Sequence, residues 1–116
     1  MINVEFLYFL GCPSHEKALC RLHAAAELEF IDIMPDIVEV KTDEQAESLK
    51  FIGSPTIRID GVDMEQPQPG PPYRLACRAY RAEDGRISRI PSLLQIRRAL
   101  RDSVCRDNIY KSGGKI

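Results

Sequence analysis

The chain has no tryptophan, and aromatic residues make up only 7% of its 116 residues. It also has no apolar run close to the roughly 20 residues of a membrane span. No basic segment precedes the first apolar residues, which Glu5 interrupts. We therefore expect neither a membrane anchor nor a signal peptide, and a cytoplasmic location follows by default. The four cysteines are few and unevenly spaced, which is typical of thiols in a reducing compartment.

Positive and negative residues nearly balance, which gives a net charge of −1, but they are unevenly distributed along the chain. Eight of the 16 Lys and Arg residues, and only two of the 17 Asp and Glu residues, lie from Arg86 onward. A basic end of this kind is able to contact nucleic acid or an acidic partner. Tyr110 is its only aromatic residue, however, so a solvated helix face is favoured. We expect no nucleic-acid partner and no membrane partner.

The length and the pattern of the chain indicate one domain over residues 1–102, followed by a basic tail over residues 103–116. Strands are predicted at residues 4–10, 37–41, 56–60 and 75–81, and helices over 12–28, over 43–51 and from 91 to about 102. The order is β-α-β-α-β-β-α. Because a helical crossover joins the first two strands, they should be parallel, and the hairpin after Pro55 should add antiparallel strands. This order predicts a three-layer α/β fold with a mixed central sheet.

Two helices carry a recognisable apolar stripe. In the first helix the candidate core residues are Ala18, Leu19, Leu22, Ala25 and Ala26. In the last helix they are Leu93, Leu94, Ile96, Ala99 and Leu100. The last helix is expected to fray after Asp102. Residues 66–73 are rich in proline and are expected to form an arm without regular structure.

Cys12 stands where the first strand passes into the first helix, and Pro13 follows it. A thiolate at a helix N-terminus is stabilised by unpaired amides and by the helix dipole, which lowers a cysteine pKa from about 8.5 into roughly the 3.5–7.5 range. His15, three positions on, is placed to lower that pKa further or to carry a proton. A thiolate attacks disulfides and binds soft metals. The alternative is that Cys12 is a small residue at a tight corner and that His15 is solvated.

A second motif, Gly53-Ser54-Pro55-Thr56, places a proline 43 positions after Cys12. Together with the run at residues 8–13 and Ala76-Cys77-Arg78-Ala79-Tyr80, it resembles a family of small bacterial thioredoxin-like proteins. Some members of that family carry selenocysteine at the reactive position, and some are labelled alkylmercury-lyase-like. The resemblance covers about residues 2–102 and implies a thioredoxin-like fold.

The resemblance also implies that Cys12 is redox-active or reactive toward soft metals, and that Pro55 is a cis proline packed against it. Because Pro55 has no amide hydrogen, it cannot pair with the thiolate. The backbone of Ser54 would then be free to pair with an extended substrate segment. We assign Pro13, Ser54 and Pro55 to the substrate groove.

His15 occupies the place of the second cysteine of a dithiol site, so the motif by itself is monothiol. Cys20 lies about two helical turns, or ~12 Å, from Cys12 and cannot bond to it in an intact helix. Cys77 is the better partner. If strand 75–81 pairs back on strand 56–60, Cys77 falls opposite Arg58, ~7 Å from the Pro55 end. Another register, or an opening of the proline-rich arm, would bring Cys77 to Cys12. The alternative is that Cys77 is a buried structural thiol.

The first hypothesis is therefore a thiol-dependent oxidoreductase without a cofactor or a metal. Cys12 is its nucleophile, His15 modulates the pKa of that thiol, and Cys77 or an external thiol resolves the mixed disulfide. The partner would be a thiol or disulfide protein, or a small-molecule thiol. The second hypothesis is a non-enzymatic protein that binds a soft metal, a mercurial or a peptide at the same site. The third is a catalytically silent interaction domain.

Overall fold

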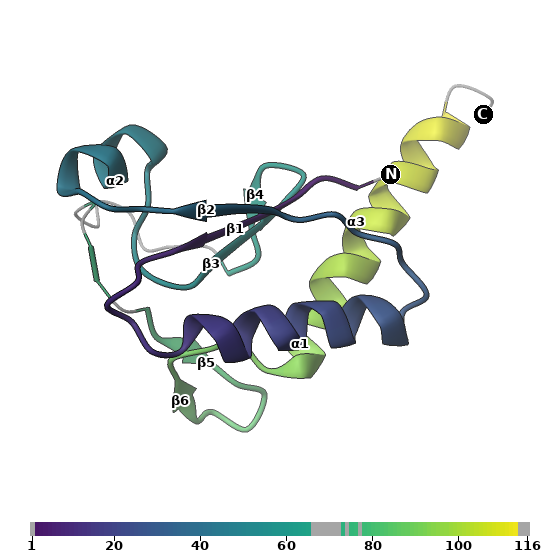
Figure 1. Ribbon diagram of the computed structural model, residues 1–116. Helices are drawn as coiled ribbons and strands as arrows, with labels where there is room; N and C mark the ends of the chain where they lie inside the picture. Colours follow the sequence, from purple (N-terminus) through teal and green to yellow (C-terminus); the bar gives the residue numbers. More distant parts are fainter. Residues whose placement is uncertain (1, 66–72, 74, 77, 114–116) are drawn as a thin grey trace.

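The computed structural model describes residues 2–65, 73, 75, 76 and 78–113, and the side-chain surroundings up to residue 105. A four-stranded sheet has the order β2 (Asp36–Glu39), β1 (Val4–Tyr8), β3 (Thr56–Ile59), β4 (Val62–Asp63), as Figure 1 shows. β1 is parallel to β2 and antiparallel to β3, and β3 is antiparallel to β4. The protein is thus an α/β protein with a mixed sheet, and the predicted parallel pairing of the first two strands is confirmed.

Helices lie on both faces of the sheet. α1 (His15–Leu28) lies on one face and the short α2 (Asp43–Leu49) lies on the other (Figure 1). α3 (Leu93–Gly113) packs against α1. The larger apolar cluster joins β1, β3, α1 and α3, and its buried members are Ile2, Val4, Phe6, Ala18, Leu22, Ala25, Ala26, Ile57, Ile59, Ile90, Ile96 and Leu100. The smaller cluster, on the α2 face, consists of Leu7, Val40, Ala46 and Phe51. Alternate residues of β1 therefore serve opposite faces, as a central strand requires.

α1 begins at His15, three residues after the predicted start. The Cys12 N–H donates to the Phe9 carbonyl at 2.9 Å, so Cys12 belongs to the turn that leaves β1. Ser14 is the residue before the helix, and its side chain makes no capping hydrogen bond. The predicted apolar stripe of this helix is confirmed by the burial of Ala18 and Leu22 and their neighbours.

The hairpin after Pro55 differs from the prediction. β3 pairs with Val62–Asp63, not with residues 75–81, in the register Arg58↔Asp63 and Ile59↔Val62. The turn between them has positive φ at both Asp60 (54°) and Gly61 (81°). A two-residue turn with positive φ at both positions matches the twist of the flanking strands, so β3 forms a tight hairpin with the residues that directly follow the turn. Arg58 is therefore paired with Asp63, and Cys77, which was expected opposite Arg58, lies outside the described residues.

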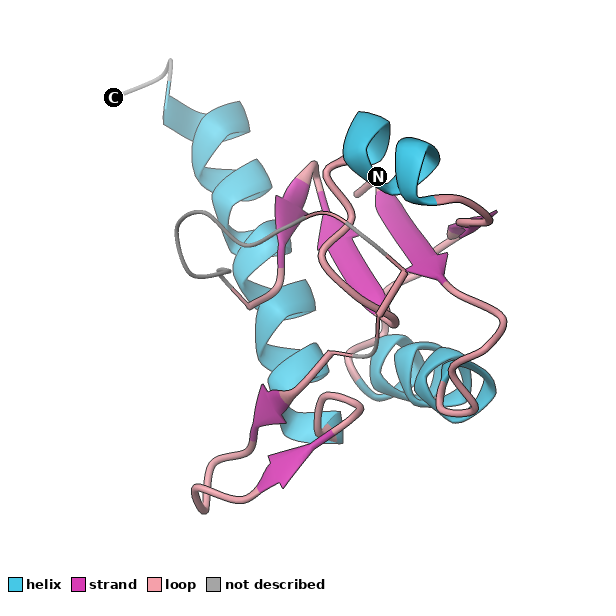
Figure 2. Cartoon of the chain, turned by 90° about the vertical axis from the view of Figure 1, so that its left-hand side faces the viewer, coloured by secondary structure: helices cyan, strands magenta, loops and turns pink. Residues whose placement is uncertain are grey.

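Of the described part of residues 75–81, only Tyr80–Arg81 forms a strand, β5. It pairs with β6 (Ile87–Ser88) in a separate hairpin, which lies beside the beginning of α3 (Figure 2). Ser92 joins the two elements, because its hydroxyl contacts Glu83 at 2.8 Å and accepts from the Gln95 N–H at 3.1 Å. Gln95 in turn accepts from the Ser92 N–H at 2.8 Å, which completes a capping box at the start of α3.

α3 continues to Gly113, past the expected end of the domain at Asp102. Ser103 is buried and bonds to Asp60, and Val104 packs on the larger cluster, so tertiary contacts extend the helix. Leu94, a predicted core residue, is 37% exposed. Among the described helices, α3 included, we find none with the length and apolar character needed to cross a membrane. The predicted proline-rich arm lies outside the described residues except for Tyr73.

Candidate functional site

The fold brings Cys12 and Ser54 together, although 42 positions separate them. The Cys12 Sγ–H points to the Ser54 carbonyl oxygen at 3.6 Å, and both side chains are fully buried. Cys12 comes from the turn between β1 and α1, whereas Ser54 lies two residues before β3. Because β1 and β3 are neighbours in the sheet, these two ends meet at one edge of it. The Ser54–Pro55 peptide bond is cis, the form that the family resemblance implies.

The carbonyl groups of three successive residues in this loop each accept a hydrogen bond. The Gly53 carbonyl accepts from Thr56 Oγ1 at 2.6 Å, and the Pro55 carbonyl accepts from the Tyr80 hydroxyl at 2.5 Å. The Ser54 carbonyl accepts from the Arg78 N–H at 2.9 Å in addition to the Cys12 thiol. The loop is therefore held by residues on both sides of it in the sequence.

The backbone of Ser54 is not open to a substrate segment in this structure. Its N–H donates to the Ala76 carbonyl at 2.7 Å, and its carbonyl accepts from the Arg78 N–H. The chain itself thus occupies the position that the sequence analysis assigned to an extended substrate. The expectation that this backbone is free is wrong, because the residues after the proline-rich arm return to Ser54 and not to β3.

Arg78 and Tyr80 fix this returning segment through their side chains. Arg78 is buried and forms an ion pair with Asp63 at 2.7 Å, donates to the Glu65 carbonyl at 2.9 Å, and lies 4.6 Å above the Tyr80 ring. Burial raises the pKa of Tyr80 well above its ordinary value of 10, so its hydroxyl stays protonated and donates to Pro55. We call Asp63, Arg78 and Tyr80 the clamp.

His15 bonds to the backbone of Cys12. Its Nδ1 lies 2.9 Å from the Cys12 carbonyl oxygen, and its ring stacks on Tyr8 with the centroids 4.6 Å apart. A hydrogen bond to a carbonyl requires the proton on Nδ1, so Nε2 is the acceptor nitrogen in the neutral ring. His15 therefore fixes the turn that carries Cys12. Pro13, between them in the sequence, is exposed.

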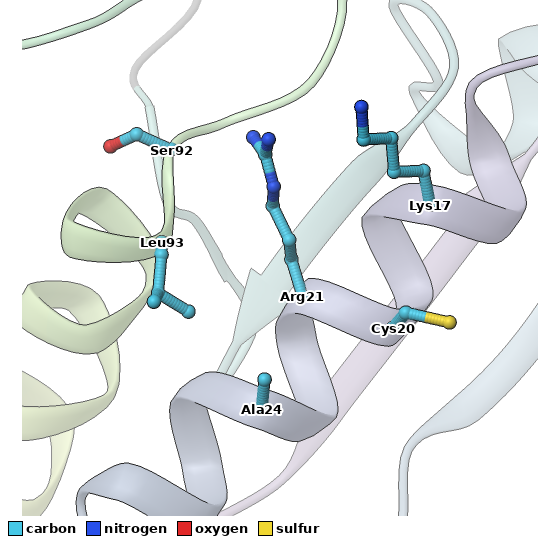
Figure 3. Close-up of a pocket in the computed structure, with 6 residues that line it drawn as sticks. All are labelled: Lys17, Cys20, Arg21, Ala24, Ser92 and Leu93. Carbon is cyan, nitrogen blue, oxygen red and sulfur yellow. The ribbon is translucent and has the colours of Figure 1, made fainter.

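The chain has three other cysteines, Cys20, Cys77 and Cys105. Cys77 lies outside the described residues, although its chain neighbours Ala76 and Arg78 both bond to Ser54. Cys105 is exposed. Cys20 is also exposed and borders a shallow pocket of about 500 Å³ between α1 and the start of α3. Figure 3 shows the Cys20 thiol pointing away from the side of the pocket on which Ser92 and Leu93 lie.

No family model matches this chain, and neither a curated protein nor a solved structure matches it. What the chain does is therefore inferred from its own geometry. Within the described residues, no group of three or more His, Cys, Asp and Glu side chains is placed to hold a metal ion.

Asp63, Arg78 and Tyr80 were not predicted as site residues. Arg78 and Tyr80 lie two positions apart, which is the spacing of side chains on one face of an extended segment. Such an alternation is common and does not indicate a partner. Ser54, which was predicted, has a further property: its hydroxyl is buried and lacks a hydrogen-bond partner among the described residues.

Proposed function

We propose that the protein is a thiol-dependent oxidoreductase with a thioredoxin-like fold, in which Cys12 is the nucleophile. The observation that carries the proposal is the 3.6 Å contact between Cys12 Sγ and the Ser54 carbonyl oxygen. The order β1-α1-β2-α2-β3-β4, ending with α3, supports a thioredoxin-like topology in which the β5–β6 hairpin is inserted before α3. Its substrate is a disulfide in a protein or a small molecule.

The reaction is a pair of thiol–disulfide exchanges. The Cys12 thiolate attacks one sulfur of the substrate disulfide, forms a mixed disulfide, and releases the other sulfur as a thiolate that takes up a proton. A second thiol then attacks the Cys12 sulfur and releases the rest of the substrate as a thiol. Two electrons have then passed to the substrate. An external thiol, in excess, reduces the disulfide that remains on Cys12.

Cys77 is the internal candidate for the second thiol. Its chain neighbours Ala76 and Arg78 bond to Ser54, whose carbonyl also contacts the Cys12 thiol. Attack by Cys77 would leave a Cys12–Cys77 disulfide for the external thiol to reduce. His15 supports the first step by fixing the Cys12 turn, and its imidazolium form would favour the thiolate.

The test is the reduction of a disulfide-linked, self-quenched fluorescent peptide with dithiothreitol as the external thiol. The wild-type chain should accelerate the reaction, and Cys12→Ser should remove the acceleration completely. Cys20→Ser is the matched control. Cys20 is an exposed cysteine in α1, the helix that follows Cys12, and it should be dispensable for the reaction. A Cys12→Ser chain that is as active as the wild type would refute the proposal.

Two further results would separate the remaining readings. Mass spectrometry after mild oxidation should detect a Cys12–Cys77 disulfide, and its absence would assign the second step to the external thiol. Stoichiometric uptake of a mercurial at Cys12, without any turnover of the peptide, would indicate instead a protein that binds soft metals.

A further inference from the structure

The proposed reaction requires access to Cys12, yet the Cys12 side chain is 0% exposed. Its neighbour Ser54 is also fully buried, and both of its backbone groups are bonded to the same short segment. An external disulfide can therefore reach neither the thiol nor the Ser54 backbone in the described conformation. Either the whole chain must unfold or one part of it must move.

One short segment occupies both backbone groups of Ser54. Ala76 and Arg78 touch the site through two backbone hydrogen bonds to Ser54, and β5, into which this segment leads, pairs with β6 within the described part of the chain. No described residue from 73 to 79 belongs to a helix or to a paired strand. Its detachment breaks the two backbone hydrogen bonds to Ser54, which is itself a single β-bridge residue, together with the side-chain contacts of Arg78. Cys12 and Ser54, in contrast, stand next to the central strands β1 and β3.

We propose that the segment that leads from Ala76 into the first residue of β5, Tyr80, is an internal occupant of the Ser54 backbone through Ala76 and Arg78, and that it must detach before Cys12 reacts with an external disulfide. The proposal deepens the proposed function and rests on it for its biological meaning. The clamp sets the closed state, because the Arg78–Asp63 ion pair and the Tyr80–Pro55 hydrogen bond are both lost when the segment leaves.

Hydrogen exchange and alkylation test this without any enzymatic activity. In the reduced wild-type chain, the amide hydrogens of Ser54 and Arg78 should exchange with solvent at the same rate. Both donate in the contact between Ser54 and the segment, so one opening event releases both. Cys12 should react with iodoacetamide at a rate set by the same opening, followed peptide by peptide so that the exposed Cys20 and Cys105 are counted separately. Each of the two variants Tyr80→Phe and Asp63→Asn should raise all three rates, by about fivefold or more for the loss of one buried hydrogen bond or ion-pair partner.

The control variant is Glu29→Gln, which removes an ion pair between α1 and α3 outside the clamp. It should leave the Ser54 exchange and the Cys12 alkylation unchanged. In the wild type, low concentrations of urea should accelerate exchange of Leu22 in the core more steeply than exchange of Ser54, because local opening exposes less surface than unfolding. This wild-type measurement decides the question even if a clamp variant fails to fold.

Equal urea dependence for Leu22, Ser54 and Cys12 would overturn the proposal, because it would show that Cys12 is reached only by global unfolding. Unchanged Cys12 alkylation in folded Tyr80→Phe and Asp63→Asn chains would also overturn it. These results do not depend on turnover of the fluorescent peptide. Failure of the internal occupant is thus distinguishable from failure of the oxidoreductase proposal.

Discussion

Two ionic contacts in this protein have the same N–O distance and very different surroundings. Arg78 and Asp63 meet at 2.7 Å with side chains that are 7% and 12% exposed. Arg97 and Glu29 also meet at 2.7 Å, and the Glu29 side chain is 10% exposed, but its two partners are more open: Arg97 is 33% exposed and Arg101 is 56% exposed. The first contact holds the segment over the candidate site, whereas the second joins α1 to α3. Distance alone therefore does not rank them, and the ranking depends on burial.

The buried contact should give the larger effect. Arg78→Ala leaves Asp63 without its partner and removes the cation above Tyr80, so the free energy of unfolding should fall by about 3–5 kcal/mol. Urea denaturation at pH 7 measures this. Arg86→Ala, which breaks an exposed 3.4 Å pair with Asp84, is the control and should cost less than about 0.5 kcal/mol. Equal costs for the two variants would refute the ranking by burial.

A neutral contact in the same loop should give a smaller effect. Thr56→Val keeps the shape of the side chain but removes the hydroxyl that donates to the Gly53 carbonyl at 2.6 Å in a buried site. The expected loss is about 1–2 kcal/mol in the same denaturation experiment. Ser48→Ala, at an exposed position of α2, should change stability by less than about 0.5 kcal/mol. A Thr56→Val chain as stable as the wild type would mean that this carbonyl finds another donor.

Features that depend on local sequence patterns were the ones that could be predicted. The apolar stripe of α1 follows from local periodicity, and the parallel pair β1–β2 follows from the helical crossover between the two strands; both are present. Cys12 and Ser54 were also predicted as site residues, because the cysteine motif and the Gly53-Ser54-Pro55-Thr56 motif occur together in one chain.

The rest depends on contacts that local patterns do not encode. β4 has only two residues, which is too short for a recognisable alternation, so the partner of β3 was misplaced. α3 continues past Asp102, where Ser103 bonds to Asp60, 43 positions away. The clamp likewise joins Asp63 to Arg78 across a proline-rich stretch, and nothing in either residue type indicates the other. Polar contacts between residues far apart in the sequence, such as Asp63–Arg78, are thus the part of this fold that could not be predicted from the sequence.

The Glu29 contact should reveal itself through pH. Hydrogen bonds from Arg101 and Arg97 lower the pKa of Glu29 from its usual 4.5 to about 2. Because the folded-state pKa is the lower one, Glu29 stabilises the fold fully above about pH 4.5, and this stabilisation is lost as the pH falls toward 2. The difference in urea midpoint between the wild type and Glu29→Gln should therefore be largest near pH 7 and shrink between pH 4.5 and 2. A difference that does not change with pH would show that Glu29 acts through packing and not through its charge.

The smallest expected effect is that of salt, which should weaken the Glu29 contact more than the Arg78–Asp63 contact. At about 1 M NaCl the screening length falls to about 3 Å, which weakens interactions between exposed charges far more than those between buried ones. The difference in stability between the wild type and Glu29→Gln should thus decrease on going from 0.05 to about 1 M NaCl. The difference between the wild type and Arg78→Ala should stay nearly constant, because Arg78 and Asp63 are shielded from the added ions. If both differences fell in proportion, the clamp would be open to solvent, and Cys12 would not depend on its detachment.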